Sequence, residues 1–524
     1  MKAVFVSIIT AALLATGCFE NKNPEGPVIR TKNGLILGEY NTQSGIYVFR
    51  GIPYASPPVG EFRWKPPQPL QNWHDTLNCT RFSACAIQET PVPFSMWTSE
   101  FIAPSAPLSE DCLYLNIWAP NKNTTEKCPV IVYIHGGGFN AGSGSVPVYD
   151  GTQMAGKGIV FVTINYRLGI FGFLAHPGLT AESDNNSSGN YGLLDQIAAL
   201  KWVKENIHAF GGDSTNITIA GQSAGAYSVC CLTASPLAGG LFHKAITQSG
   251  GAVLPTGRFS HTATLDTAEK IGQATAASLQ IKTIDGLRNI PADELLQAKG
   301  NFGPIVDGYV LPDIIYNTYF KGKQNDVPLL AGWNANEGLY FFEVKNATGF
   351  KEKSREIYGS HANDFLRFFP ADNDSVARLS QFSHADMLSF GVQAYKWTTM
   401  QAKTGKSPVY LYYFSRRVPY GNEQADYGAF HSSEIFYAFN NLGISKNRPW
   451  QKVDYALANT MSGYWANFAK TGNPNGKGLP DWLPCKTEAL NAMFLGDTVK
   501  ITPVPEIEKL RFLESFYESA FYVN

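Results

Sequence analysis

Short apolar runs alternate with Gly-rich turns and one amphipathic stretch through the centre of the chain. Within residues 192–209, Leu193, Ile197, Leu200 and Ile207 share one helical face. The apolar runs cover residues 130–134, 159–164, 217–220, 245–248, 327–332 and 409–414. Such runs are typical of buried strands. Strands separated by helices predict an α/β fold with a mostly parallel central sheet covered on both sides.

Most of residues 255–325 and 345–405 is predicted to be helical insertion between the later strands. The chain has no internal repeat, low-complexity tract or long Pro/Gly/Ser linker. Although 524 residues can hold several domains, residues 28–524 are therefore predicted to form one large domain.

The N-terminal residues have the pattern of an export signal. One Lys precedes an apolar run from Ala3 to Ala15, which is too short to span a bilayer. Small residues followed by Cys18 resemble a bacterial lipoprotein cleavage box, so we expect residues 1–17 to be a signal peptide and 18–27 a tether. Lipidated Cys18 would hold an exported protein at the bacterial envelope membrane. The alternative is ordinary cleavage nearby and a secreted protein.

Composition narrows the class of partner. Only 16% of residues are charged, the formal net charge is −1, and no run of Lys or Arg exceeds two residues. The sequence therefore has no cluster of positive charge of the kind that binds nucleic acid or an anionic membrane. A small-molecule partner is favoured instead.

Seven cysteines remain beside the lipidation candidate, and export would permit disulfides among them. Cys79 has Cys128 and Cys485 as alternative partners, whereas adjacent Cys230 and Cys231 are expected to be buried thiols. No CxxC motif or His-rich cluster is present, so we expect no metal and no cofactor.

The pentapeptide Gly221–Gly225 lies between the apolar run 217–220 and a helix-compatible stretch. A serine at such a strand-to-helix turn is strained and lifts its hydroxyl clear of the sheet, so Ser223 is the predicted nucleophile. The following helix would point its N–H groups at an anion formed there. The alternative is an ordinary Gly-rich turn.

A second Gly-rich segment, residues 135–139 (HGGGF), directly follows the first apolar run. Consecutive glycines allow backbone N–H groups to converge, so Gly137, Gly138 and Ala224 are the predicted oxyanion-hole donors. The segment lacks the Lys-Ser/Thr of a phosphate-binding loop. His135 is expected to hydrogen-bond within this loop rather than to act in catalysis.

These motifs together resemble the type-B carboxylesterase family, which includes cholinesterases, liver carboxylesterases and bacterial para-nitrobenzyl esterases. The resemblance covers roughly residues 28–520 and implies the α/β-hydrolase fold. The matching motifs are FGGD at 210–213 with the serine pentapeptide, EDCLYLN at 110–116, FRGIPYA at 49–55 and NYRLG at 165–169.

The resemblance implies a triad of Ser223, His431 and Glu337. Glu337 lies in NANEG, where Asn336 replaces a common Asp, and His431 lies in GAFHSSE. In such a triad the imidazole takes the serine proton and the carboxylate fixes its tautomer. Asp307 and Glu434 remain alternative acids.

Further positions follow from the same resemblance. Ser249 is similar to a serine behind the triad, and Cys85 with Cys112 resembles a disulfide that closes a flap over the pocket. Trp97 lies inside that flap, but its spacing does not match a choline-binding Trp. Aromatic residues near the motifs are expected in the pocket wall or, alternatively, in the core. They are Trp97, Phe139, Trp333, Tyr340, Phe341 and Phe342.

The sequence thus predicts a carboxylic-ester hydrolase that acts through an acyl-enzyme on a small-molecule ester. One alternative is a lipase that acts at interfaces. Another is a non-catalytic adhesion module of the same fold, which would be expected to have lost the nucleophile.

Overall fold

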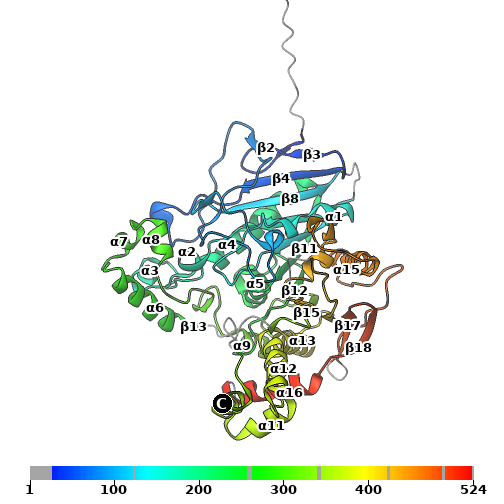
Figure 1. The fold of residues 1–524 in the computed structure, drawn as a ribbon. Coiled ribbons are helices and arrows are strands. Elements are labelled where there is room, and N and C mark those ends of the chain that lie inside the picture. The colour runs from blue at the N-terminus through cyan, green and yellow to red at the C-terminus, as the bar shows by residue number, and fades with distance from the viewer. Residues whose placement is uncertain are drawn as a thin grey trace, which may run out of the picture.

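A large sheet runs through the centre of the molecule (Figure 1). The computed structural model describes residues 26–121, 126–256, 263–338, 344–421, 425–486 and 490–521. Within these ranges the main sheet has 11 strands. In spatial order they are β18 (Val499–Pro503), β17 (Asn491–Leu495), β16 (Val409–Phe414), β15 (Leu329–Asn334), β12 (Lys244–Gln248), β11 (Gly212–Gln222), β9 (Cys128–Ile134), β10 (Val160–Ile164), β8 (Tyr114–Pro120), β4 (Ile46–Pro53) and β3 (Glu39–Asn41).

The strands from β10 through β9, β11, β12, β15 and β16 to β17 are parallel. Antiparallel pairing occurs at the two edges, where β8 joins β10 and β4, and where β18 joins β17. The predicted α/β fold with a mostly parallel sheet is confirmed, and each of the six apolar runs overlaps one strand of this sheet. The antiparallel edges were not predicted.

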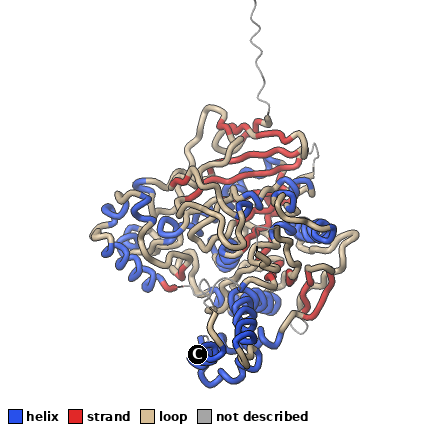
Figure 2. The backbone as a smooth tube through the Cα atoms, in the orientation of Figure 1, coloured by secondary structure: helices blue, strands red, loops and turns tan. Residues whose placement is uncertain are grey.

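Strand β9 shows how the sheet separates two layers. Val130, Val132 and Ile134 pack in one hydrophobic cluster, while Ile131 and Tyr133 pack in another. Successive side chains of a strand point to opposite faces, so a continuous apolar run buries both. The first cluster holds side chains of α4 (Tyr191–Asn206), α5 (Ala224–Ala234) and α13 (Val392–Thr404), and the second those of α15 (Lys452–Thr471). Figure 2 shows helices on both sides of the strands.

The two predicted insertions are largely helical, as expected. The first contains α6 (Leu265–Ser278), α7 (Ile284–Arg288), α8 (Ala292–Leu296) and α9 (Ile315–Phe320). The second contains α10 (Ala347–Tyr358), α11 (Ala362–Phe368), α12 (Asp374–Asp386) and α13, with a π-helical turn at Met387–Gly391 between the last two. A π-helical turn inside a helix often marks a functional site.

The predicted disulfide between Cys85 and Cys112 is not formed, because both are free thiols. The two side chains pack in different hydrophobic clusters, and the Cys85 thiol lies 3.6 Å from Ser145 Oγ. Burial raises the pKa of Cys79 to about 12. Cys230 and Cys231 are buried within α5, as predicted.

The signal peptide, the lipidation site Cys18 and all but the last two residues of the predicted tether lie outside the described ranges. None of the helices within those ranges combines the length and the apolar composition needed to cross a bilayer.

Candidate active site

Ser223 lies in a sharp turn between β11, which ends at Gln222, and α5, which begins at Ala224. Its backbone angles are φ 56° and ψ −124°. A residue with a Cβ rarely adopts a positive φ, and such strain is concentrated at functional sites. The Ser223 N–H donates to the Gln248 carbonyl at 2.9 Å, which ties the turn to β12.

The two glycines of the pentapeptide are required by close backbone approach. A Cβ on Gly221 would lie 2.4 Å from the carbonyl carbon of Gly225. A Cβ on Gly225 would lie 2.0 Å from the Ile134 carbonyl oxygen, at the end of β9. The G-x-S-x-G pattern therefore allows α5 to start directly against the sheet.

The predicted oxyanion segment leaves the end of β9 and reaches the same place. Gly137 and Gly138 have φ values of 108° and 62°. A Cβ on Gly137 would lie 2.1 Å from the Ala141 carbonyl oxygen. Both glycines line one cavity with Ser223, and Ala224 is the next residue, at the N-terminus of α5. The structure thus brings the three predicted donors and Ser223 together.

His431 and Glu337 form a buried pair, with Nδ1 3.2 Å from Oε1. Their side chains are only 4% and 0% exposed. Asn336 connects the two loops, because its Oδ1 accepts from the Ala429 N–H at 2.9 Å. An Asp would also supply this acceptor, so Asn336 preserves the contact.

Burial is the main cause of the pKa shifts of this pair. It disfavours the charged form of each group, so it raises the pKa of Glu337 to about 8 and lowers the pKa of His431 to about 4. The nearby Glu434 carboxyl raises the pKa of His431 by a smaller amount. The imidazole is therefore held in its neutral, basic form.

The two alternative acids have other partners. Glu434 accepts from Gln248 Nε2 at 3.1 Å and from Asn334 Nδ2 at 2.5 Å. Asp307 accepts from Ser187 Oγ at 2.6 Å and from backbone N–H groups of its own turn. Among these three carboxyl groups, within the described residues, Glu337 alone hydrogen-bonds the imidazole of His431.

Ser249 lies beside this pair, completely buried and with φ 52°. Its hydroxyl lowers the pKa of Glu337 and so offsets part of the effect of burial. Neither Ser249 Oγ nor Glu337 Oε2 has a partner of standard hydrogen-bond geometry within the described ranges. The Ser249 hydroxyl is therefore close enough to favour the ionised form of Glu337, although the two groups do not form a hydrogen bond of standard geometry.

Three residues near the site were missed by sequence reasoning. Phe390, from the π-helical turn, stacks on the His431 ring at a centroid distance of 4.5 Å. Gln222 places its amide nitrogen 3.1 Å from His431 Nε2. Asp386 accepts from the Gly338 N–H next to Glu337, and burial raises its pKa to about 8. Gln222 was detectable as the variable position of the pentapeptide, whereas the other two carry no sequence signal.

The cavity over Ser223 and His431 has a volume of about 440 Å³. Within the described residues, no hydrogen bond joins Ser223 Oγ to the imidazole, although both groups line this cavity. In the absence of substrate, catalytic hydrogen bonds are often long and tighten only in the complex. The wall is mainly aromatic and aliphatic, and includes Trp97, Phe101 and Phe390.

The pocket aromatics were predicted only in part. Trp97 does line the cavity, and its ring meets His431 edge-on at 6.3 Å. Phe139 instead packs in the core against Phe173 and Tyr227. Trp333 lines a different cavity. Tyr340, Phe341 and Phe342 lie outside the described residues.

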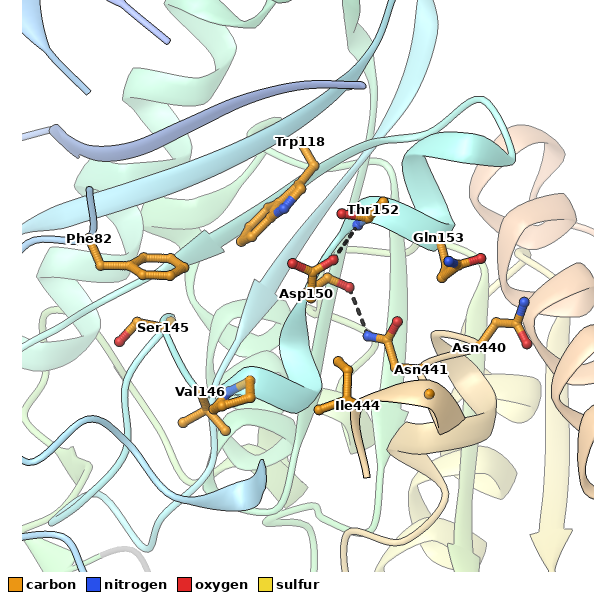
Figure 3. Close-up of a pocket in the computed structure, with 13 residues that line it drawn as sticks. Phe82, Trp118, Ser145, Val146, Asp150, Thr152, Gln153, Asn440, Asn441 and Ile444 are labelled. Atoms are coloured by element: carbon orange, nitrogen blue, oxygen red, sulfur yellow. Dashed lines mark hydrogen bonds between the residues drawn. The ribbon is translucent and has the colours of Figure 1, made fainter. Parts of the chain in front are cut away.

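A second cavity of about 470 Å³ adjoins the first, and the two share Val146. Figure 3 shows Phe82 and Trp118 on one side of it and Asn440, Asn441 and Ile444 on the other. Asp150 is fixed between them, because its Oδ1 accepts from the Thr152 N–H at 2.9 Å. Neither Ser223 nor His431 lines this cavity, so it is separate from the cavity over the predicted nucleophile.

A parallel sheet with a strained serine at a strand-to-helix turn defines an α/β-hydrolase. The model of the carboxylesterase family matches residues 25–513, and the chain therefore belongs to that family, as the sequence motifs predicted. It is accordingly a carboxylic-ester hydrolase.

Curated relatives agree with this assignment. The chain is 38% identical to a fumonisin B1 esterase of Sphingopyxis macrogoltabida, with 86% of this chain and 82% of the relative covered. It is 35% identical to a para-nitrobenzyl esterase of Bacillus subtilis, with 92% and 97% covered. A solved para-nitrobenzyl esterase superposes with a TM-score of 0.79 at 33% identity, and covers 92% of this chain and 98% of its own.

Proposed function

We propose that this carboxylesterase acts through an acyl-enzyme on Ser223, with His431 as general base and Glu337 as its carboxylate partner. The buried contact between His431 Nδ1 and Glu337 Oε1, at the edge of the cavity that contains Ser223, carries the proposal.

In the first half-reaction, Ser223 Oγ attacks the ester carbonyl carbon while His431 Nε2 takes the hydroxyl proton. The tetrahedral oxyanion accepts hydrogen bonds from the N–H groups of Gly137, Gly138 and Ala224. Collapse breaks the bond to the alcohol, which leaves with the proton from His431. Water then attacks the acyl-enzyme by the same route, and the acid is released with Ser223 restored.

The cavity supports small esters with apolar acyl or alcohol groups. Its lining contains one carboxylate, Glu89, and no Lys or Arg among the described residues. Apolar walls with a few fixed polar groups are typical of small-molecule sites. An adhesion module without catalysis is disfavoured, because the nucleophile and the proposed triad are retained.

The direct test is Ser223→Ala, assayed with a short-chain nitrophenyl ester. Loss of the nucleophile of a triad lowers kcat by about 10⁶-fold, so the variant is expected to be almost inactive. Ser228→Ala is a matched control, because Ser228 is buried one turn later in α5 and bonds Gln196 rather than the site. Retention of more than about 1% of wild-type kcat by Ser223→Ala would refute the proposal.

Interfacial lipase activity is a second candidate because of the residues at the cavity mouth. Val92 and Phe94 line the cavity and are 61% and 59% exposed. Exposed apolar side chains at a binding site suit contact with a lipid surface. A rise in rate above the solubility limit of a long-chain ester would establish this activity, and a smooth saturation curve would exclude it.

We further propose that the protein is exported and is held at a bacterial envelope membrane through lipidated Cys18. The support is the short apolar N-terminal segment followed by small residues and cysteine. A lipid anchor requires no membrane-spanning helix.

A further inference from the structure

Gln222 stands immediately before the proposed nucleophile, at the last position of β11, and its side chain is buried. The amide oxygen faces the backbone of the oxyanion segment, where a Cβ on Gly136 would lie 3.1 Å from Oε1. The amide nitrogen faces His431 from the other side. Gln222 thus lies between two parts of the proposed machinery.

The distances identify which imidazole nitrogen accepts a hydrogen bond from the Gln222 amide. Gln222 Nε2 lies 3.1 Å from His431 Nε2 and 3.5 Å from Nδ1. Nδ1 is already engaged by Glu337 Oε1 at 3.2 Å. A side-chain amide nitrogen only donates hydrogen bonds, so its partner must present a lone pair. When Glu337 is ionised, Nδ1 carries the proton that it donates to Oε1, so the nitrogen that offers a lone pair is Nε2.

We propose that Gln222 is a positioning residue, whose amide donates to His431 Nε2 in the resting enzyme and keeps that atom free of a proton. This inference rests on the proposed function, in which Nε2 is the atom that takes the proton of Ser223. Glu337 at Nδ1 and Gln222 at Nε2 then favour the same neutral tautomer, in which Nδ1 carries the proton and Nε2 is free to act as a base. When substrate is bound, the Ser223 hydroxyl replaces the amide as the donor to Nε2.

The charges near His431 explain why a neutral amide at position 222 affects the protonation of the imidazole. Among the described residues, the titratable groups around His431 are Glu337 at Nδ1, Glu434, whose charge raises the pKa of the imidazole, and Tyr149 and Glu89 in the cavity wall. Phe390 and Trp97 cover the ring with uncharged aromatic surface. A glutamate at position 222 would place a carboxylate beside Nε2 and favour the imidazolium, whereas the neutral amide of Gln222 does not.

Two variants test the two relevant properties of the Gln222 amide, which are its hydrogen-bond donor and its lack of charge. Gln222→Met keeps the length but removes the donor, and Gln222→Glu places an acceptor and a negative charge beside Nε2. A donor to the lone pair favours the unprotonated ring, so its loss makes protonation easier and moves the acid limb of kcat/KM to higher pH by up to about one unit. A carboxylate stabilises imidazolium directly, and the expected upward shift is about 1–3 units.

The control is Gln196→Met, since Gln196 is also a buried glutamine but donates to Ser228 and does not line the cavity. The acid limb of kcat/KM for Gln196→Met is expected to match that of the wild type, even if the variant has a lower melting temperature. Coincidence of the acid limbs of Gln222→Met, Gln222→Glu and wild type would overturn the proposal, as would a downward shift in either variant at position 222.

A ¹⁵N-histidine NMR spectrum of the resting enzyme tests the same point without turnover, with His431 assigned by loss of its signals in His431→Asn. At about pH 9, where Glu337 is mostly ionised, we expect Nε2 to be an unprotonated nitrogen that accepts a hydrogen bond. In Gln222→Met we expect the ¹⁵N chemical shift of Nε2 to move to the value of an unprotonated nitrogen without a hydrogen-bond donor. A protonated Nε2 in the wild type at this pH overturns the inference. Activity retained by Ser223→Ala would instead refute the proposed function, so the two failures are distinguishable.

Discussion

Replacement of Glu337 by Gln gives a quantitative test of the proposed triad. The substitution keeps the side-chain shape but exchanges a carboxylate for an amide, whose NH₂ group can face His431 Nδ1. That donor favours the wrong tautomer, and the charge that stabilises imidazolium is lost.

The size of the effect follows from the 3.2 Å between His431 Nδ1 and Glu337 Oε1. At an effective dielectric constant of about 20, unit charges at this separation attract by about 5 kcal/mol. At about 1.36 kcal/mol per decade, this corresponds to a loss of about 10³–10⁴ in kcat. An Asp-to-Asn change in the serine-protease template has an effect of about 10⁴.

The assay is steady-state hydrolysis of a nitrophenyl ester at about pH 9, where a carboxyl with a pKa of about 8 is mostly ionised. Asp307→Asn and Glu434→Gln are the controls, and both are expected to keep far more activity. Thermal melting must show equal folding of the three variants, because a buried carboxyl also affects stability. The reasoning fails if Glu337→Gln stays within about tenfold of wild type while either control loses activity by about 10³-fold or more.

Three further predictions concern anchoring, stability and the turn. Cys18→Ser is expected to lose incorporated labelled fatty acid and to move to the soluble fraction, and equal solubility of the two proteins counts against anchoring. Burial raises the pKa of Asp386 to about 8, so the stability it contributes is full below its ordinary pKa of 3.8 and is lost as the pH rises through about 8. Asp386→Asn keeps the acceptor for the Gly338 N–H and should raise Tm at about pH 9 more than at about pH 5; an equal change at both would contradict this. Gly225→Ala should abolish activity or soluble expression because of the 2.0 Å approach to Ile134, whereas Gly156→Ala, which meets nothing within 4 Å, should be tolerated, and equal tolerance of both would contradict the packing argument.

The central strands and the turn at Ser223 were predictable because local rules determine them. A run such as residues 130–134 is apolar on both faces, which suits a strand covered by helices on both sides. Gly221 and Gly225 carry the signature of a turn that packs directly against β9. The strand β4 at the antiparallel edge has a register irregularity between Phe49 and Ile52, and its alternating pattern was not recognised.

The surroundings of His431 were not predictable in the same way. Phe390 reaches the imidazole only because a π-helical turn interrupts the helical insertion, and that turn has no motif. The expected disulfide was inferred from resemblance, but Cys85 and Cys112 pack in separate clusters. Phe139 and Trp333 lie beside the sequence motifs yet do not line the cavity, because neighbouring positions of a segment face different directions.

The central claim is that Ser223 forms the acyl-enzyme, and mass spectrometry of the intact protein, mixed rapidly with an activated ester and quenched in acid, tests it most directly. We predict one acyl group per chain, located on the peptide that contains Ser223 and absent from Ser223→Ala. Acylation at another residue, or hydrolysis at the wild-type rate with no acylated protein and full activity in Ser223→Ala, would contradict the account.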